Sequence, residues 1–443
     1  MAEEERWFDN EFSEVYSEEL AELLHFEESN VQKLQYCSFG VLSSLHTLLF
    51  RMLFCATLKR LLIIFHTKGI ISEDTLHLTV IASGLFMMWT QNTFALSVFS
   101  FTALVIVVPY YKFLFKKNIK FKILIYSIGM LLIWQCLMTA EKFMSIRGIL
   151  MVMLMKTTSV SFDLANELYK DISLLQLLSY VLDGSTILFG PWITYKQYHD
   201  SLEMKNVEVE IMNCFRALSY ILFSLLAVIY SSCVADNFTE WYFVGAYFVA
   251  QSFRFSHYFV CWLSAGISLL SGVDSGSIVD WTRIELPRSL VDVVVSWNIP
   301  MHQFLHQYVF GEMRKYGSAI AIFATYVGIN FQLSAVLLSL GFYTYAETKL
   351  RSRLSRRTNS CVRAKKCHEE CSHAWKENSM PTLAVNMIFR IVAIIHLVYL
   401  GMAFDNSTAE TGYSWNHTLN VWGDSYYFSH SIGTLTLISS FII

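Results

Sequence analysis

Long apolar stretches recur through most of this 443-residue chain, and they constrain its fold more than any other feature. A helix that crosses a bilayer needs roughly 20 apolar residues, because its backbone polar groups find no water to bind there. Charged residues make up only 16% of the sequence, whereas they make up about a quarter of soluble domains. The pattern therefore predicts an all-α integral membrane protein.

We expect about ten to twelve transmembrane or re-entrant helices, because that many apolar segments can be distinguished. The longer candidates are residues 37–57, 75–91, 94–113, 122–140, 174–195, 214–235, 242–270, 318–346, 383–404 and 426–443. Shorter or broken apolar segments lie near 147–162 and 289–310. No inverted internal repeat of the kind found in many transporters is visible. One polytopic domain over residues 37–443 is the simplest organisation.

Residues 1–36 are acidic, and they lack the basic region and apolar core of a cleavable signal peptide. Phe12, Tyr16, Leu20 and Leu23 recur at helical spacing within this segment. The spacing predicts an amphipathic helix that lies at the membrane interface and has a structural role.

The longest basic stretch runs from Lys349 to Lys376, and the positive-inside rule places it in the cytosol. N-glycosylation sequons begin at Asn237, Asn406 and Asn416. Counting the spans between them and the basic stretch places all three in the lumen. This topology predicts a multi-pass protein of the endoplasmic reticulum membrane. The small net charge of -3 argues against nucleic acid as a partner.

Nine cysteines are scattered through the chain, many of them in apolar segments, and we expect buried, reduced thiols. Cys361, Cys367, Cys371 and His373 have a spacing that resembles a metal site. The spacing departs from the common paired CxxC pattern, and two lysines lie inside it. We therefore favour a solvated cytosolic loop, with a lipid-modified cysteine as an option, over a zinc site.

The segment from Ile284 to Phe310 is apolar enough to enter a bilayer, yet it carries an arginine, an aspartate, an asparagine and two histidines. Polar groups in hydrocarbon are costly unless satisfied, so they often mark a site or a water-filled cavity. Pro300 interrupts the helix directly after Asn298. Asn298 can therefore be a site residue or a residue that packs helices together. His302 and His306 lie one turn apart without a third ligand, and we expect no metal there.

Three further polar segments interrupt the apolar pattern, and together with Ile284–Phe310 they indicate a shared internal cavity. Their sequences are KTTSVSFD at 156–163, FGPW at 189–192 and SFRFSHY at 252–258. The chain contains no GxSxG, Walker or dinucleotide-binding motif, so a soluble-enzyme fold is not supported.

These segments resemble the membrane-bound O-acyltransferases. The similar stretches are MKTTSVSFDL (155–164), STILFGPWITY (185–195), FRFSHYFV (253–260), IELPRSLVDVVVSWNIPM (284–301), AVLLSLGFYTYAETKLRSRL (335–354), CHEECSH (367–373) and IIHLVYLGMAFD (394–405). ELPRS followed by SWN-P-M is specific to the branch that modifies Wnt proteins. The similarity spans roughly residues 150–405, and residues 1–140 match only in being apolar.

The resemblance implies a helical bundle around a tunnel, in which a palmitoleoyl group passes from acyl-CoA to a serine of a Wnt protein. Acyl-CoA, as palmitoleoyl-CoA, would be a co-substrate, and no cofactor is implied. Wnt proteins, acyl-CoA and membrane lipids are the expected partners. The family's catalytic asparagine corresponds to Asn298. The residues expected to line the tunnel are Trp297, Trp192, Phe162, Asp163, Ser256 and Tyr258.

The family's catalytic histidine has no counterpart, because no histidine lies between His306 and His368. About six family residues are missing just before Phe331. We favour loss of this stretch from an isoform or gene model; a pseudoenzyme that binds Wnt or acyl-CoA, or substitution by His302 or His306, are the alternatives. A transporter is a further alternative, supported by the intramembrane charges of Lys156, Asp163 and Arg254.

Overall fold

The computed structural model describes residues 2–89, 120–169, 172–235, 242–310, 331–368, 370–404 and 415–443. Within these ranges the regular elements are helices, and one isolated β-bridge joins Ser360 and Trp375. The predicted all-α fold is therefore confirmed. The span expected at 94–113, the first half of that expected at 318–346, and the sequons at Asn237 and Asn406 lie outside the described residues.

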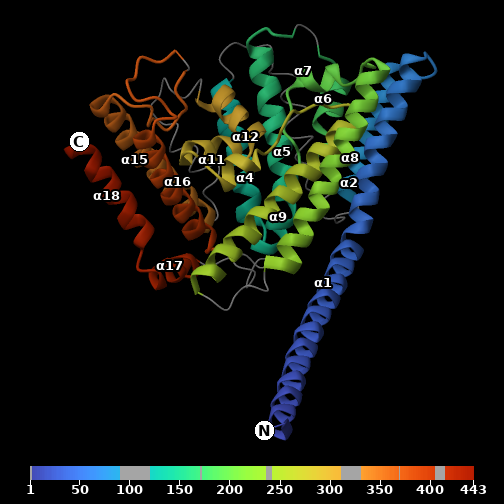
Figure 1. The fold of residues 1–443 in the computed structure, drawn as a ribbon. Helices are drawn as coiled ribbons and strands as arrows, with labels where there is room; N and C mark the ends of the chain where they lie inside the picture. Colours follow the sequence, from blue (N-terminus) through green and yellow to red (C-terminus); the bar gives the residue numbers. More distant parts are fainter. Residues whose placement is uncertain are drawn as a thin grey trace.

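Figure 1 shows how the helices pack, and their bounds follow in chain order. They are α1 (Ala2–Thr67), α2 (Glu73–Trp89), α4 (Lys120–Leu137), α5 (Ala140–Ala165), α6 (Leu174–Val181), α7 (Tyr195–Asp200), α8 (Val207–Ile229), η1 (Tyr230–Val234), α9 (Tyr242–Leu270), α10 (Trp281–Glu285), α11 (Leu290–Ser296), α12 (Ile299–Phe304), η3 (Leu305–Phe310), α15 (Phe331–Thr358), α16 (Met380–Gly401), α17 (Trp415–Asp424) and α18 (Phe428–Ile442).

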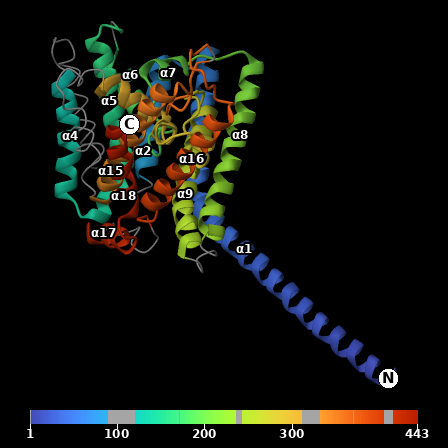
Figure 2. The same cartoon turned by 60° about the vertical axis from the view of Figure 1, so that its left-hand side comes forward.

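Helix α1 runs without a break through residue 36, and its N-terminal part extends away from the other helices (Figures 1 and 2). The predicted boundary at residue 36 and the amphipathic character of the first segment stay predictions.

Helix α17 and the loop between α15 and α16 lie at opposite ends of the bundle in both views. The molecule therefore has two distinct ends, as a membrane-spanning bundle requires.

Three of the described helical stretches are long and apolar enough to cross a membrane. They are Glu141–Ala165 in α5, Val207–Val234 across α8 and η1, and Met380–Gly401, which is α16. Helices α8 and α16 expose large apolar side chains, among them Phe215 and Ile388. Exposed apolar faces of this size are expected to contact lipid rather than water.

The single span predicted at 174–195 is wrong, because the chain leaves α6 after Val181 and becomes helical again only at Tyr195. Asp183 lies in this break and is fully buried. Its carboxylate accepts a hydrogen bond from Lys59 of α1 at 2.6 Å and others from the backbone N–H and the hydroxyl of Ser185 at 3.0 and 2.8 Å. The buried ion pair and its hydrogen bonds satisfy a charge that a continuous apolar helix would leave unpaired.

The basic stretch predicted as a loop from Lys349 is helical as far as Thr358. Arg351, on the last turns of α15, is fully buried. The basic residues therefore did not mark where the loop begins, because the guanidinium of Arg351 is buried within the protein. The loop itself begins at Asn359.

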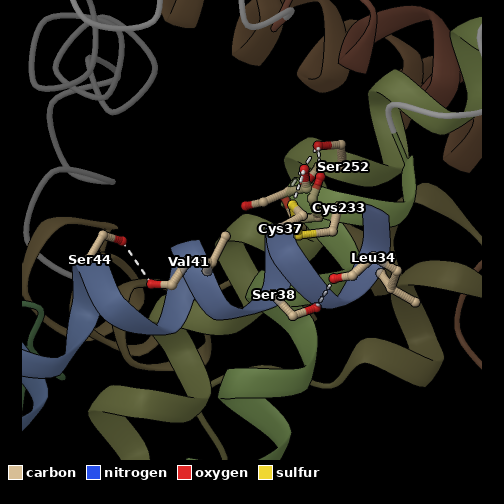
Figure 3. The surroundings of a disulfide bond; sticks show 9 residues. Leu34, Cys37, Ser38, Val41, Ser44, Cys233 and Ser252 are labelled. Atoms are coloured by element: carbon tan, nitrogen blue, oxygen red, sulfur yellow. Dashed lines mark hydrogen bonds between the residues drawn. A yellow bond between two sulfur atoms is a disulfide. The ribbon is translucent and has the colours of Figure 1, made fainter. Parts of the chain in front are cut away.

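The expectation of reduced thiols is wrong for two cysteines, because Cys37 of α1 and Cys233 of η1 form a disulfide (Figure 3). Beside it, the hydroxyl of Ser252 in α9 donates to the backbone oxygen of Ser231 at 3.0 Å. Cys136 and Cys214 are free but exposed, whereas Cys55 and Cys261 are free and buried as predicted. Periodicity could not reveal the pairing, because the bonded cysteines are 196 residues apart.

Candidate functional site

A cavity of about 510 Å³ lies between α5, α9, α15, α16 and the broken segment that joins α11, α12 and η3. Leucine, valine, methionine and aromatic side chains form most of its wall. The polar residues that line it are Arg147, Arg254, Asn298 and His302. A largely apolar cavity with a few converging polar groups is typical of a binding site for an organic ligand.

Asn298 occupies the break between α11 and α12 and lines the cavity. It is the N-cap of α12, where its side-chain oxygen Oδ1 accepts a hydrogen bond from the backbone N–H of Met301 at 3.0 Å. Pro300 follows in the first turn of the helix, a position that tolerates the missing N–H. Because Oδ1 is used as the cap, the amide Nδ2 remains as the donor that this side chain can offer a ligand.

His302 lies one helical turn beyond Asn298 and lines the same cavity. Its backbone N–H donates to the backbone oxygen of Asn298 at 2.9 Å. His306 is exposed and does not line the cavity, although the two imidazole rings are only 6.3 Å apart. Of the two histidines noted in the sequence, only His302 lines the same cavity as Asn298.

Trp297 also lines the cavity and is held against α9 by stacked rings. Its indole stacks on His257 at 4.4 Å between ring centroids, and on Phe253 at 6.0 Å. Nε2 of His257 lies 2.8 Å from the backbone oxygen of Trp297. Stacking and the hydrogen bond together fix the backbone just before Asn298.

Arg254 lines the cavity, but Glu285 from the ELPRS segment pairs with its charge. The guanidinium donates two hydrogen bonds to the carboxylate, at 2.8 and 3.0 Å. The hydroxyl of Tyr258 donates to the same carboxylate at 2.8 Å. Tyr258 is therefore placed behind the cavity wall, and Arg254 is a paired structural cation rather than an isolated charge in a pathway.

Phe162, Asp163 and Trp192 do not line this cavity; they contact Phe304 of α12 or Tyr308 of η3. The hydroxyl of Tyr308 in η3 lies 2.9 and 3.1 Å from the two carboxylate oxygens of Asp163. Trp192 packs edge-on against Phe304 and Tyr308, at 5.4 and 5.8 Å between ring centroids. These three residues hold in place the segment that carries Asn298 and His302.

Ser256 does not line the cavity either, and its hydroxyl donates to the backbone oxygen of Phe253 in its own helix at 2.8 Å. Of the four polar segments expected to share one cavity, only 252–258 and 284–310 reach it. Sequence reasoning missed the leucines of α15 and α16 and Arg147 of α5, because an apolar helix does not reveal which of its faces borders a cavity.

The sequence profile of the membrane-bound O-acyltransferase family matches residues 77–337, more than half of the chain. The chain belongs to the membrane-bound O-acyltransferase family. The match begins well before residue 150, where the resemblance was expected to start, so α2, α4 and the first turns of α5 belong to the family fold as well. Membership makes this chain an acyltransferase and does not favour the transporter alternative.

Curated relatives named protein-serine O-palmitoleoyltransferase porcupine are similar to this O-acyltransferase. The human protein is 33% identical over 64% of this chain and 70% of its own length. The Caenorhabditis briggsae protein is 32% identical over 68% of this chain and 72% of its own length. The Anopheles gambiae protein is 30% identical over 73% of this chain and 74% of its own length.

Proposed function

We propose that this O-acyltransferase transfers a palmitoleoyl group from acyl-CoA to a serine of Wnt proteins in the endoplasmic reticulum membrane. The relatives in three phyla are named for palmitoleoyl transfer to a protein serine. The observation that carries the proposal is the largely apolar cavity of about 510 Å³ that adjoins Asn298. The ELPRS and SWN-P-M motifs support Wnt as the protein substrate.

The cavity can hold the acyl chain while Asn298 meets the thioester. Its volume of about 510 Å³ falls within the roughly 300–1,000 Å³ of small-molecule sites. Each methylene buried against the apolar wall contributes about 0.8 kcal/mol. An acyl chain is therefore the kind of ligand for which this wall is suited, and a polar substrate is not.

In the proposed reaction the serine oxygen attacks the thioester carbonyl carbon, a C–O bond forms and the C–S bond breaks. A general base accepts the serine proton, which then passes to the departing CoA sulfur. The carbonyl oxygen carries negative charge in the tetrahedral intermediate and needs a fixed donor. Nδ2 of Asn298 is our candidate for this donor, since the N-cap hydrogen bond already fixes the side chain through Oδ1.

His302 is our candidate for the base in this chain. Among the described residues that line the cavity it is the single histidine, and it lies one turn from Asn298. Imidazole is the most frequent general base at neutral pH. The position of His302 in the cavity wall supports its acting in place of the missing family histidine. The alternatives are an isoform that lacks the family histidine and a non-catalytic binder.

The disulfide supports the proposed orientation in the endoplasmic reticulum. Disulfides persist in the oxidising lumen and are rare in the cytosol. Cys233 of this disulfide lies four residues before the sequon at Asn237, which the positive-inside rule also assigns to the lumen. Two independent signals thus support the same side of the membrane for this end of the molecule.

Substitution of Asn298 tests the proposal by removing the Nδ2 donor either alone or together with the helix cap. Asn298→Asp keeps an acceptor for the Met301 N–H but removes the Nδ2 donor, whereas Asn298→Ala removes both. We expect each variant to lose about 10²–10³-fold in the rate of palmitoleoyl transfer, as when one oxyanion donor is removed. The measurement is transfer from palmitoleoyl-CoA to a Wnt hairpin peptide by the purified protein in detergent.

Gln303→Ala is the matched control, because Gln303 is exposed on the same helix and does not line the cavity. It should keep parental activity. Parental rates in both Asn298 variants would remove this residue from the mechanism. If the unaltered protein binds palmitoleoyl-CoA but shows no turnover, the chain is a binder rather than an enzyme.

A further inference from the structure

Three thiols and an imidazole converge in the loop between α15 and α16. The ligand atoms of Cys361, Cys367, Cys371 and His373 all lie within 4.8 Å of one another. Sγ of Cys361 lies 3.3 Å from Sγ of Cys371. Nδ1 of His373 lies 3.7 Å from the sulfur atoms of both Cys361 and Cys367. The loop thus brings together four potential ligands that are scattered along its sequence.

We propose that these four residues bind a structural zinc ion. With Zn–S bonds of about 2.3 Å and a Zn–N bond of about 2.0–2.1 Å, a tetrahedral site separates its ligand atoms by roughly 3.6–3.8 Å. The separations of 3.3 and 3.7 Å observed here are close to those values. The cysteines are free, and their sulfur atoms are well beyond disulfide bonding distance, which is about 2.05 Å.

The hydrogen bonds around His373 point its metal-binding nitrogen at the thiols. The hydroxyl of Ser355 donates to the backbone oxygen of Ser360 at 2.6 Å, so its only hydrogen is already used. Nε2 of His373 lies 3.2 Å from that hydroxyl oxygen and must therefore be the donor. Nδ1 then carries the lone pair, and it faces the sulfur atoms. Zinc-binding histidines generally have such a partner on the second ring nitrogen.

The charge around the cluster suits three thiolates. Zinc with three thiolates and a neutral histidine has a net charge of minus one. Nζ of Lys376 lies 3.5 Å from Sγ of Cys371 and also donates to the backbone oxygen of that residue. The ammonium group therefore lies where it offsets the excess negative charge. All four coordination positions are taken by protein, as in structural rather than catalytic zinc sites.

The proposed site would fix the loop that anchors the ELPRS segment. Arg288 donates to the backbone oxygen of Cys361 at 3.0 Å, and Ser289 donates to that of Ala364 at 3.1 Å. Trp375 closes the loop through its backbone oxygen, which accepts from the N–H of Cys361 at 2.9 Å. None of the four ligands lines the cavity. The ion would thus act on the loop and the segments attached to it, not on the reacting groups.

Metal content tests the proposal directly and independently of activity. The full chain is purified in detergent under mild reduction without chelators, and zinc is measured by mass spectrometry. We expect about one zinc per chain. Cys361→Ser and Cys367→Ser should each lose it, whereas Cys136→Ser and Cys214→Ser, which change exposed free cysteines elsewhere, should keep it. Replacement of zinc by cobalt should produce the absorption bands of a tetrahedral thiolate site.

Ser355→Ala tests the histidine orientation, with an expected loss of about 10–100-fold in zinc affinity measured by chelator competition. Several outcomes would overturn the proposal. The first is a parent protein that is isolated without metal and takes up no cobalt after reduction. The second is an intact mass that shows a Cys361–Cys371 disulfide or an acylated cysteine in the isolated protein. The third is full zinc retention by both the Cys361→Ser and the Cys367→Ser variant. Unchanged affinity in Ser355→Ala would contradict binding through Nδ1.

Discussion

At the scale of single residues, Asn298 combines a structural and a chemical task in one side chain. Its oxygen caps α12, and its amide nitrogen is left for the cavity. The same cap fixes the start of the helix whose next turn carries His302. Helix geometry alone therefore places a donor and a potential base side by side, since residues four apart share one face.

His302 and His306 form a matched pair for testing which histidine acts as the base. Glutamine is close in size and polarity to histidine but cannot accept a proton near neutral pH. We expect His302→Gln to lower the rate of palmitoleoyl transfer by about 10²–10⁴-fold. His306→Gln should retain parental activity, because His306 is exposed outside the cavity. Equal rates for the two variants would rule out His302 as the base.

At the scale of elements, Arg351 joins α15 to the ELPRS segment, which is distant in sequence, and to the loop that follows α15. Its guanidinium donates to the backbone oxygens of Arg288, Val362 and Arg363 at 2.8, 2.7 and 3.1 Å. It also binds the carboxylate of Glu347 at 2.9 Å, and that carboxylate accepts the backbone N–H of Leu290 at the start of α11. One buried side chain thus holds α15, the ELPRS segment and the loop in register.

Arg351→Met should destabilise this junction, because it leaves Glu347 buried without its counter-ion. Breaking a buried ion pair in this way costs about 3–5 kcal/mol. We expect a lower midpoint of thermal unfolding for the protein in detergent. Arg356→Met, which changes an exposed arginine on the same helix, should alter stability by less than about 0.5 kcal/mol. A midpoint unchanged by Arg351→Met would show that the junction contributes little.

At the scale of the whole molecule, covalent and polar links tie together segments that lie far apart in the chain. The Cys37–Cys233 disulfide joins α1 to η1 across 196 residues (Figure 3). Lys59 of α1 pairs with Asp183 in the break after α6. Helix α1 is therefore attached to the bundle at two separate points, even though its N-terminal part extends away from it (Figure 2).

Removal of the disulfide should destabilise the folded bundle. Loss of a native disulfide costs about 2–5 kcal/mol in small secreted domains, where it restricts the unfolded chain. We expect Cys37→Ser to lower the unfolding midpoint in detergent, and Cys214→Ser, at an exposed free cysteine, to leave it unchanged. Peptide mapping without reduction should recover the Cys37–Cys233 linkage. Free thiols at both positions would contradict it.

Sequence alone determined the helical class, the membrane character, the broken segment at Asn298 and the family, because each of these rests on local periodicity or on a contiguous motif. Proline is disfavoured in the interior of a helix whatever surrounds it, so a break next to Pro300 could be predicted without knowing its neighbours. The family motifs likewise needed no contacts to be recognised.

Only the tertiary structure decided which of these residues meet. Phe162, Asp163 and Trp192 belong to family motifs as Asn298 does, yet they contact Phe304 or Tyr308 outside the cavity, while apolar residues of α15 and α16 line it. The disulfide, the burial of Arg351 and the convergence of Cys361, Cys367 and Cys371 are also tertiary outcomes. The physical reason is that side-chain proximity depends on how helices and loops pack in space, and neither periodicity nor spacing along the chain contains that information.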